Sequence, residues 1–443
     1  MSQLKKGISP PQIIVLGFLA IILFGAFLLT LPVSSATGEG TSFLNSLFTA
    51  TSAVCVTGLI VLDTGTYWSS FGKFVIISLI QIGGLGFMTI TTFGVIMIGK
   101  KIGIRNRILM QESLGQEKVQ GIISLTKNIF LGTMFIEMIG ALLLSTQFIP
   151  AFGWKDGITK SFFHSISAFC NAGFDTLGNF SSLTGYYSNP VINMTIMLLI
   201  IFGGLGFTVI FDFTKNKKFK KLSLHSKLAL LVTSILLVFG TLVMLFLEYS
   251  NPETIGQMSL FNKLQVSAFQ AVSPRTAGFN TIDLAKLTDS SKFFMMLLMF
   301  VGGSPASTAG GIKTTTLAVL VLAMLAFVNN RDVEAYGRRI NYSVVNKAMT
   351  IVVIALFIVI TGSMLISIGN PDIAFLDILF EVTSAFATVG LTLGITTKLT
   401  AMSQFILILI MFAGRVGALT IILALASRDK KYGYQLPEGN VLL

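Results

Sequence analysis

The sequence is poor in charged side chains. Asp, Glu, Lys and Arg together make up 11% of the 443 residues, about half or less of the share in soluble domains. Hydrophobic residues make up 53%, and the mean hydropathy is +0.82. So few charges cannot cover the surface of a soluble protein of this length. The composition therefore excludes a soluble globular class.

Cysteine and histidine are also scarce. Cys55 and Cys170 are the only cysteines, and His164 and His225 the only histidines. Two cysteines cannot build a disulfide framework, and neither stands near a second ligand at the spacing of a metal site. No paired carboxylates and no nucleophile with a base occur in any apolar run or loop. An enzyme is therefore not predicted.

Long apolar runs recur at regular intervals along the chain. A helix of about 20 residues is long enough to cross a hydrocarbon core of about 30 Å. We expect eight spans, and they begin near Pro11, Phe71, Ile122, Pro190, Ser226, Phe293, Ala348 and Met402. The predicted fold class is an all-α integral membrane protein.

Basic residues gather between alternate spans. Of the 31 Lys and Arg residues, 21 lie in the N-terminal segment or in residues 100–127, 215–227, 331–347 and 428–431. Positive loops tend to stay on the cytoplasmic side, so both termini are predicted to be cytoplasmic. This topology accounts for most of the formal charge of +12. Nucleic acid is not a predicted partner, because the basic residues form no single stripe with interleaved aromatics.

A shorter apolar stretch follows each odd-numbered span. Residues 42–53 would rise only about 18 Å as a helix, so we expect this stretch to enter the membrane and return. Each such stretch carries the pattern Phe-x-x-x-Ser, at residues 48–52, 163–167, 269–273 and 380–384. A pattern repeated four times predicts a repeated structural unit. We interpret the shared Phe and Ser as structural.

Each serine is followed by a short stretch of small and polar residues that ends in glycine. We call these stretches, from serine to glycine, the filter segments: residues 52–58, 167–173, 273–278 and 384–390. The third is one residue shorter, and Pro274 and Arg275 replace small and apolar residues there, so we expect it to be built differently. Glycine reaches backbone angles that can aim carbonyls inward, and non-helical backbone at membrane depth is tolerated where it lines a wet cavity. The pattern predicts a cation pore.

The repeated unit is therefore span, pore helix, filter and span. We divide the chain into units 1–110, 111–222, 223–338 and 339–443, arranged around one central pore. The C-terminal ends of the pore helices would carry about half a negative charge each and favour a cation. Small-residue clusters follow each filter in the next span, and we assign Gly83, Gly84, Gly203 and Gly204 to helix packing.

Two functions from different classes remain open: a cation-selective permease, and an ion-coupled symporter of another solute. A symporter typically has titratable residues around a midplane site, whereas Glu137 stands nearly alone in the spans. Glu137 either carries protons or makes a buried structural hydrogen bond. The permease is the favoured interpretation.

The motifs resemble those of the Trk, Ktr and HKT superfamily of potassium transporters, and within it the membrane subunits of bacterial Ktr systems. The resemblance spans nearly the whole chain and is carried by residues 273–280 (Ser-Pro-Arg-Thr-Ala-Gly-Phe-Asn), 384–390 (Ser-Ala-Phe-Ala-Thr-Val-Gly) and 302–313. It implies uptake of K⁺ across a bacterial plasma membrane. Family members with serine at the first filter tend to favour Na⁺, so Gly58 implies K⁺.

The resemblance also implies which residues form the site. K⁺ would bind the last three residues of each filter: Val56, Thr57, Gly58, Asn171, Ala172, Gly173, Thr276, Ala277, Gly278, Thr388, Val389 and Gly390. A gating loop would interrupt the sixth span, and its implied residues are Gly302, Gly303, Ser304, Ala306, Ser307, Thr308, Ala309, Gly310, Gly311 and Lys313, with Arg415 facing the pore from the last span. Pro305 and the many small residues around it independently argue against continuous helix there. A charge at mid-membrane usually faces a water-filled path, so we expect Arg415 to contact the loop and to repel cations locally.

The resemblance further implies assembly partners. These are a second copy of the chain, with one pore per subunit, and a cytosolic ring of nucleotide-binding regulatory subunits, in addition to the surrounding membrane lipid. It leaves open whether Na⁺ activates transport or is coupled to it. Residues 105–118 and 215–227 are candidate docking surfaces for the ring, or serve topology alone.

Overall fold

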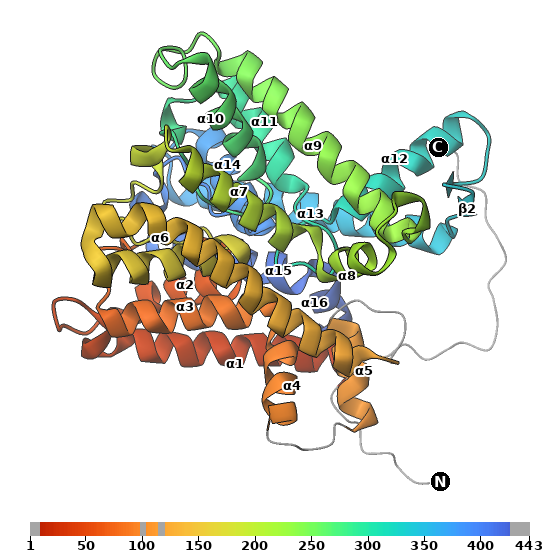
Figure 1. Ribbon diagram of the computed structural model, residues 1–443, viewed down its shortest axis with the longest axis horizontal. Coiled ribbons are helices and arrows are strands. Elements are labelled where there is room, and N and C mark those ends of the chain that lie inside the picture. The colour runs from red at the N-terminus through yellow and green to blue at the C-terminus, as the bar shows by residue number, and fades with distance from the viewer. Residues whose placement is uncertain (1–8, 98–102, 114–119, 426–443) are drawn as a thin grey trace.

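The computed structural model describes residues 9–97, 103–113 and 120–425. Within these ranges, the regular secondary structure is almost entirely helical. The strands β1 (Glu334–Ala335) and β2 (Arg338–Arg339) form a small antiparallel hairpin. Five short 3-10 helices cover Pro32–Ser34, Thr184–Tyr186, Phe219–Lys221, Leu284–Lys286 and Thr396–Lys398. The all-α prediction is confirmed, and Figure 1 shows most of the long helices running side by side.

Within the described ranges, four helices are long and apolar enough to cross a membrane: α1 (Pro10–Thr30), α6 (Ile122–Phe169), α9 (Leu224–Glu248) and α13 (Tyr342–Gly369). Each provides the first span of one predicted unit. Two further spans result if α3 (Ser70–Leu85) is counted with α4 (Phe87–Met97), and α7 (Pro190–Leu205) with α8 (Phe207–Asn216), although these pairs are bent by 90° and 92°.

The prediction of eight spans, with only the sixth interrupted, needs correction, because the second span of every unit is interrupted. The breaks fall at Gly86, Gly206 and Gly417, whose φ angles are 79°, 90° and 91°, and at the non-helical residues 301–313. Those residues separate α11 (Asp289–Phe300) from α12 (Thr314–Val328), and Gly417 separates α15 (Ala401–Val416) from α16 (Ala418–Leu425). A left-handed glycine ends a helix at little steric cost.

Four pore helices enter the bundle, as the sequence predicts. They are α2 (Phe43–Val54), the part of α6 after Gly153, α10 (Leu260–Val272) and α14 (Phe375–Ala387). At Gly153 the backbone is non-helical (φ 78°, ψ 172°) and α6 turns back on itself. Gly157 permits the tight hairpin, because a Cβ atom there would lie 2.6 Å from the Cα of Ile149.

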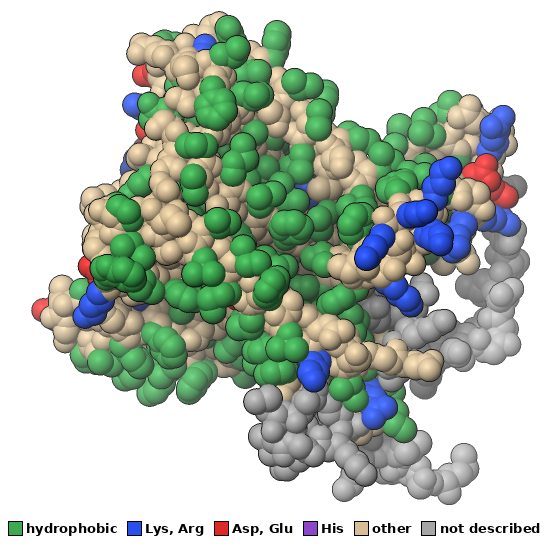
Figure 2. Space-filling view, viewed as in Figure 1, with side chains coloured by type: hydrophobic (Ala, Val, Ile, Leu, Met, Phe, Trp, Pro, Cys, Tyr) green, Lys and Arg blue, Asp and Glu red, His purple; other side chains and the backbone are tan. Residues whose placement is uncertain are grey.

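The pore helices form the interior, while the long helices face outward. The Phe of each Phe-x-x-x-Ser pattern is at most 5% exposed, and burying a side chain of this size contributes about 1.5–3 kcal/mol. By contrast, Phe135, Phe246 and Phe357 on the long helices are 68%, 81% and 68% exposed. Figure 2 shows hydrophobic side chains over this face and Lys and Arg gathered at one end, near α8 and the β hairpin. An apolar surface of this extent suits a lipid environment.

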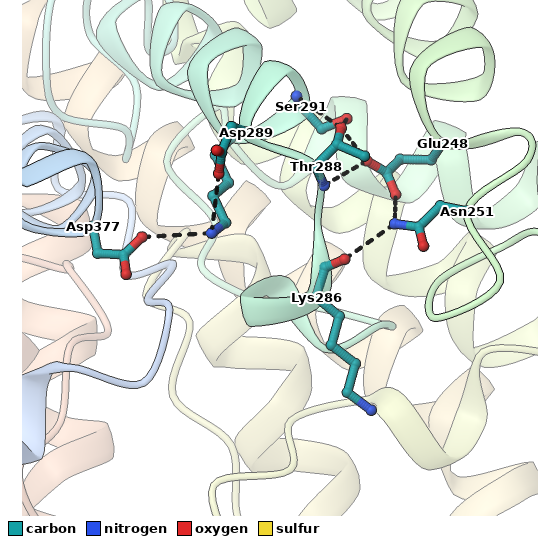
Figure 3. Close-up of polar contacts among 8 residues, drawn as sticks. Glu248, Asn251, Lys286, Thr288, Asp289, Ser291 and Asp377 are labelled. Carbon is teal, nitrogen blue, oxygen red and sulfur yellow. Dashed lines mark hydrogen bonds and ion pairs between the residues drawn. The ribbon is translucent and has the colours of Figure 1, made fainter. Parts of the chain in front are cut away.

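Polar contacts near the start of α11 stabilise the third unit and join it to the fourth. Glu248, the last residue of α9, accepts hydrogen bonds from the Thr288 N–H (3.0 Å) and hydroxyl (2.8 Å) at the start of α11 (Figure 3). Lys292 of α11 pairs with Asp289 (3.6 Å) and with Asp377 of α14 (3.5 Å). The short helix α5 (Ile104–Ser113) completes the described chain.

Candidate ion pathway

The four filter segments meet in a closed ring. Each filter glycine lies so close to the next filter that an added Cβ atom would approach the carbonyl oxygen of the residue that precedes the next glycine. These pairs are Gly58 with Ala172 (2.5 Å), Gly173 with Ala277 (2.9 Å), Gly278 with Val389 (2.5 Å) and Gly390 with Thr57 (2.0 Å). The order therefore runs through all four units and returns to the first.

The backbone of each filter alternates in handedness. The residue two before the glycine has a positive φ in all four segments: Val56 (56°), Asn171 (58°), Thr276 (74°) and Thr388 (52°). The next residue has a negative φ, and the glycine again has a positive one, between 69° and 94°. A left-handed non-glycine residue costs about 1–3 kcal/mol and persists where its surroundings enforce it. Alternating handedness turns successive carbonyls toward the same side, as a carbonyl-lined cation site requires.

The serines of the Phe-x-x-x-Ser pattern form hydrogen bonds with the filter backbone. Ser52 Oγ accepts a hydrogen bond from the Gly58 N–H, and Ser384 Oγ accepts one from the Gly390 N–H, both at 3.0 Å. In the other two filters the hydroxyl donates instead, to the carbonyl oxygen of the residue after the glycine: Ser167 to Phe174 (2.7 Å) and Ser273 to Phe279. The serine of the Phe-x-x-x-Ser pattern thus fixes the filter backbone.

The shorter third filter closes with a tighter turn. In the first, second and fourth filters, the N–H of the residue before the glycine donates to the serine carbonyl five residues earlier, at 2.7–2.8 Å. In the third filter Ala277 donates to Ser273, four residues earlier, at 2.9 Å. Because this turn is one residue tighter, Gly278 reaches the same position in the ring although the third filter is one residue shorter.

Oxygen atoms are the available ligands at the filters. Besides the carbonyls, the Oγ1 atoms of Thr57, Thr276 and Thr388 are buried without a hydrogen-bond partner in the described part of the chain. A buried hydroxyl without a partner costs about 1–3 kcal/mol. A hydrated or partly dehydrated cation beside the filters would relieve that cost, and carbonyl and hydroxyl oxygens suit a hard cation.

Residues 301–313, which contain the predicted gating loop, fold into a closed loop beside the ring. Its neck is a bridge between Val301 and Ile312, with a hydrogen bond from the Gly302 N–H to the Ile312 carbonyl (2.9 Å). The Thr314 N–H donates to the Gly303 carbonyl (3.0 Å), and the hydroxyls of Ser304 and Thr314 are 3.0 Å apart. These bonds replace the helical ladder that Pro305 and its neighbours cannot form.

The loop lies against the second unit and against the fourth filter. The N–H groups of Ser304 and Thr308 donate to the carbonyls of Gly204 (2.8 Å) and Gly203 (3.2 Å). The Phe207 N–H donates a hydrogen bond to the Ala306 carbonyl, and within the loop Ser307 Oγ donates to the Ser304 carbonyl. At the other end of the loop, Gly310 and Gly311 pack against Thr388 and Ala387. The loop therefore packs directly against the fourth filter.

Arg415 and Lys313 are cationic side chains that bind the loop. Arg415 donates from Nη1 to the Thr308 carbonyl and from Nη2 to the carbonyls of Gly83 and Gly84 (3.1 Å to Gly84). Arg415 thus joins the fourth unit, the loop and the first unit. Lys313 donates from Nζ to the Ala309 carbonyl (2.7 Å), so it binds its own loop.

A cavity of about 410 Å³ lies beside the loop. Its lining includes Pro305, Ser307, Lys313, Lys347 and Arg415, and no acidic side chain among the described residues contributes to it. Three basic side chains, with no acidic side chain in the described lining, disfavour a cation in this cavity. The loop thus contacts both the fourth filter and this cavity.

Glu137 lies behind the second filter. Its carboxylate accepts a hydrogen bond from Gln81 Nε2 (3.2 Å) and lies 3.8 Å from the Cys170 thiol, while its backbone carbonyl accepts one from Ser165 Oγ (2.6 Å). The sequence marked Glu137 as unusual but did not indicate Gln81 or Cys170 as partners, because nothing in their spacing links the three residues.

A ring of strained, glycine-ended loops at the ends of four pore helices, inside an apolar bundle, defines a membrane transport protein. The family model TrkH, described as "Cation transport protein", matches residues 11–433. The chain belongs to this family of transport proteins and is not an enzyme.

Two relatives support this family assignment, and a solved structure shares the fold. The chain is 45% identical to the "Ktr system potassium uptake protein B" of Bacillus subtilis, covering 98% of this chain and 96% of the relative. It is 42% identical to the "Potassium/sodium uptake protein NtpJ" of Enterococcus hirae, covering 100% and 98%. The crystal structure of the potassium transporter TrkH from Vibrio parahaemolyticus is similar with a TM-score of 0.75 at 18% identity, covering 96% of this chain and 86% of that one. That likeness shows the fold.

Proposed function

We propose that the chain takes up K⁺ across the bacterial plasma membrane as a selective permease. The observation that carries the proposal is the closed ring in which each filter glycine faces a carbonyl of the next filter. The printed names of the relatives, which include potassium uptake, support K⁺ as the transported ion. The four units, with the boundaries predicted above, would each contribute one filter.

In this proposal the carbonyls of the last three residues of each filter replace the hydration shell of K⁺. The four pore helices point their C-terminal ends at the ring and favour a cation there. Glycine suits the ring positions, because a side chain there would hold a strained left-handed backbone and would displace the neighbouring carbonyl.

Residues 302–313 would act as the gate. The loop lies against the fourth filter and is held by Arg415, while the cavity beside it is lined with positive charges. Movement of the loop would open a path from the filters to the cavity. Arg415 would set the closed position, because it binds the loop and a separate unit at once.

The remaining parts of the proposal concern topology and assembly. Both termini would be cytoplasmic, which places the exposed lysines of residues 215–221 on that side. Residues 1–8 and 426–443 lie outside the described residues, as do parts of 100–127 and of the candidate docking segment 105–118. We propose a homodimer and a cytosolic nucleotide-binding ring as partner, since a relative is named as part of a Ktr system. Activation by Na⁺, or coupling to it, is proposed from the printed name of another relative.

The test is tracer uptake of Rb⁺ into liposomes that contain the purified protein, with Na⁺ as competitor. We expect uptake down a K⁺ gradient that Na⁺ competes with poorly, and loss of this preference in Gly58→Ser. Gly394→Ser is the matched control, because Gly394 also has a positive φ (82°) but has no atom within 4 Å of an added Cβ. Uptake that requires a pH gradient, or none of either cation, would favour the ion-coupled symporter of another solute.

A further inference from the structure

Three of the four units share a close contact between the pore helix and the following span. The carbonyl of the residue two after the shared serine lies against a span glycine, so that an added Cβ would be 1.8–2.0 Å from it: Val54 with Gly83, Phe169 with Gly203, and Phe386 with Gly414. The corresponding residue in the third unit is Arg275.

Arg275 does not repeat this contact: helix α11 ends at Phe300, and an added Cβ at Gly302 would instead lie 2.5 Å from the Gly310 carbonyl oxygen. Instead its side chain reaches the start of the loop: Nη2 donates to the Gly302 carbonyl at 3.4 Å and to the Thr233 hydroxyl of α9 at 3.3 Å. Gly302 also packs against the Thr276 side chain, since an added Cβ would lie 2.9 Å from its Cγ2. The third filter therefore touches the first residue of the loop both through Arg275 and directly.

The guanidinium is buried in an unusual environment. Arg275 is 5% exposed, and no ion pair to it is found within the described ranges. Its charge is balanced by carbonyl groups: it follows the C-terminal end of α10, where a cation is favoured, and it binds the Gly302 carbonyl. Because burying a charge without a carboxylate partner is costly, the position of Gly302 is part of what stabilises this arginine.

We propose that Arg275 is a positioning residue that couples the third filter to the loop and holds the loop at Gly302, as Arg415 holds it at Thr308. The inference rests on the proposed gating function of residues 302–313. If the loop moved, the guanidinium would lose the Gly302 carbonyl as a partner. The hydrogen bond between Arg275 and Gly302 therefore stabilises the loop position described here. Lysine cannot replace it fully, because its ammonium is a compact and more strongly hydrated charge than a guanidinium and therefore costs more to bury.

The test measures how exposed the loop becomes. Ser307→Cys introduces a reporter thiol that lines the cavity, while the native Cys55 and Cys170 are both 0% exposed and should not react. The rate of modification by a soluble maleimide is compared in Arg275→Gln, Arg275→Lys and Thr233→Val backgrounds. Arg415→Gln is the positive control, and Arg339→Gln, whose side chain is 66% exposed, is the matched negative control.

We expect Arg275→Gln to raise the labelling rate about tenfold, as loss of a hydrogen bond to a charged group would. Arg275→Lys should lie between wild type and Arg275→Gln, and Thr233→Val should raise the rate by a smaller factor. In liposomes, the maximal rate of Rb⁺ uptake should rise with loop exposure, while the half-saturating concentration stays unchanged because the filter glycines remain in place.

The inference is overturned if Arg415→Gln raises the labelling rate while Arg275→Gln and Thr233→Val leave it at the wild-type value. It is also overturned if Arg275→Gln alters the half-saturating concentration without altering loop labelling, since Arg275 would then act on the filter alone. Should Arg275→Gln fail to fold, Thr233→Val, which keeps shape and volume, decides the question. Absence of uptake by the wild type would refute the proposed function, whereas the labelling rates would still report on Arg275.

Discussion

Gly390 of the fourth filter lies against Thr57 of the first, and an added Cβ atom would be 2.0 Å from the Thr57 carbonyl oxygen. This contact joins the two ends of the repeated architecture. It shows that the four filters surround one axis instead of lying in a row, because the fourth unit must return to the first for the contact to exist.

The four glycine contacts predict a graded series of alanine variants. All four glycines have a positive φ, but the distance from an added Cβ to the nearest carbonyl oxygen falls from 2.9 Å at Gly173 to 2.5 Å at Gly58 and Gly278 and 2.0 Å at Gly390. We expect the Rb⁺ preference over Na⁺ to be reduced least in Gly173→Ala and most in Gly390→Ala. Gly394→Ala should match wild type. An equal loss in all four variants would mean that backbone strain alone, and not the ring contact, determines the effect.

The serine hydroxyls predict a second effect. Ser52→Ala leaves the buried Gly58 N–H without a partner, which should lower the free energy of unfolding by about 1–3 kcal/mol and weaken Rb⁺ preference. Ser46→Ala on the same pore helix is the control, because its buried Oγ has no hydrogen-bond partner within the described chain. Thermal unfolding in detergent, together with tracer uptake, measures both effects. Equal behaviour of the two variants would contradict the role given to Ser52.

Glu137 allows the two roles left open by the sequence to be separated. Glu137→Gln preserves an oxygen that can accept from Gln81, so we expect it to fold and to transport Rb⁺ at a rate close to wild type. Glu137→Ala removes the acceptor and should lower thermal stability, since an unpaired buried group costs about 1–3 kcal/mol. The exposed Glu253→Ala serves as control. If Glu137→Gln folds but loses uptake, proton transfer at this carboxyl is required.

Asp175, in the segment that follows the second filter, predicts a pH dependence of stability. Burial, helped by the nearby Asp63 charge, raises the pKa of Asp175 from its usual 3.8 to about 6. The folded protein thus holds this proton more tightly than the unfolded chain, so the contribution of Asp175 to stability falls as pH rises from about 4 to about 6 and stays low above that. Melting temperatures of wild type and Asp175→Asn across this range measure the effect.

In Asp175→Asn we expect this component of the pH profile to be absent and the melting temperature at pH 7 to be higher relative to pH 4 than in wild type. Asp283→Asn, at an exposed loop position, should retain the wild-type profile. Parallel profiles for wild type and Asp175→Asn would show that Asp175 does not titrate in this range in the folded protein.

Much of the fold followed from local pattern. Apolar length predicted where helices begin, and the Phe-x-x-x-Ser repeat placed all four pore helices, because both features depend on residues close together in the chain. The interrupted second spans were predicted only for the third unit, where Pro305 gives a local signal. At Gly86, Gly206 and Gly417 the last glycine of each small-residue cluster adopts a left-handed backbone, and neither composition nor hydropathy distinguishes such a glycine from one that packs within a helix.

The sequence by itself determined the class of protein, the repeated unit and the positions of the filter glycines, since composition, span length and a fourfold motif require no knowledge of contacts. Only the tertiary structure decided the order of the ring, the partners of Glu137 and Arg415, and the reach of Arg275 to Gly302. Those relationships join residues from different units, and which side chains meet there depends on how four similar units pack around one axis, which no local pattern encodes.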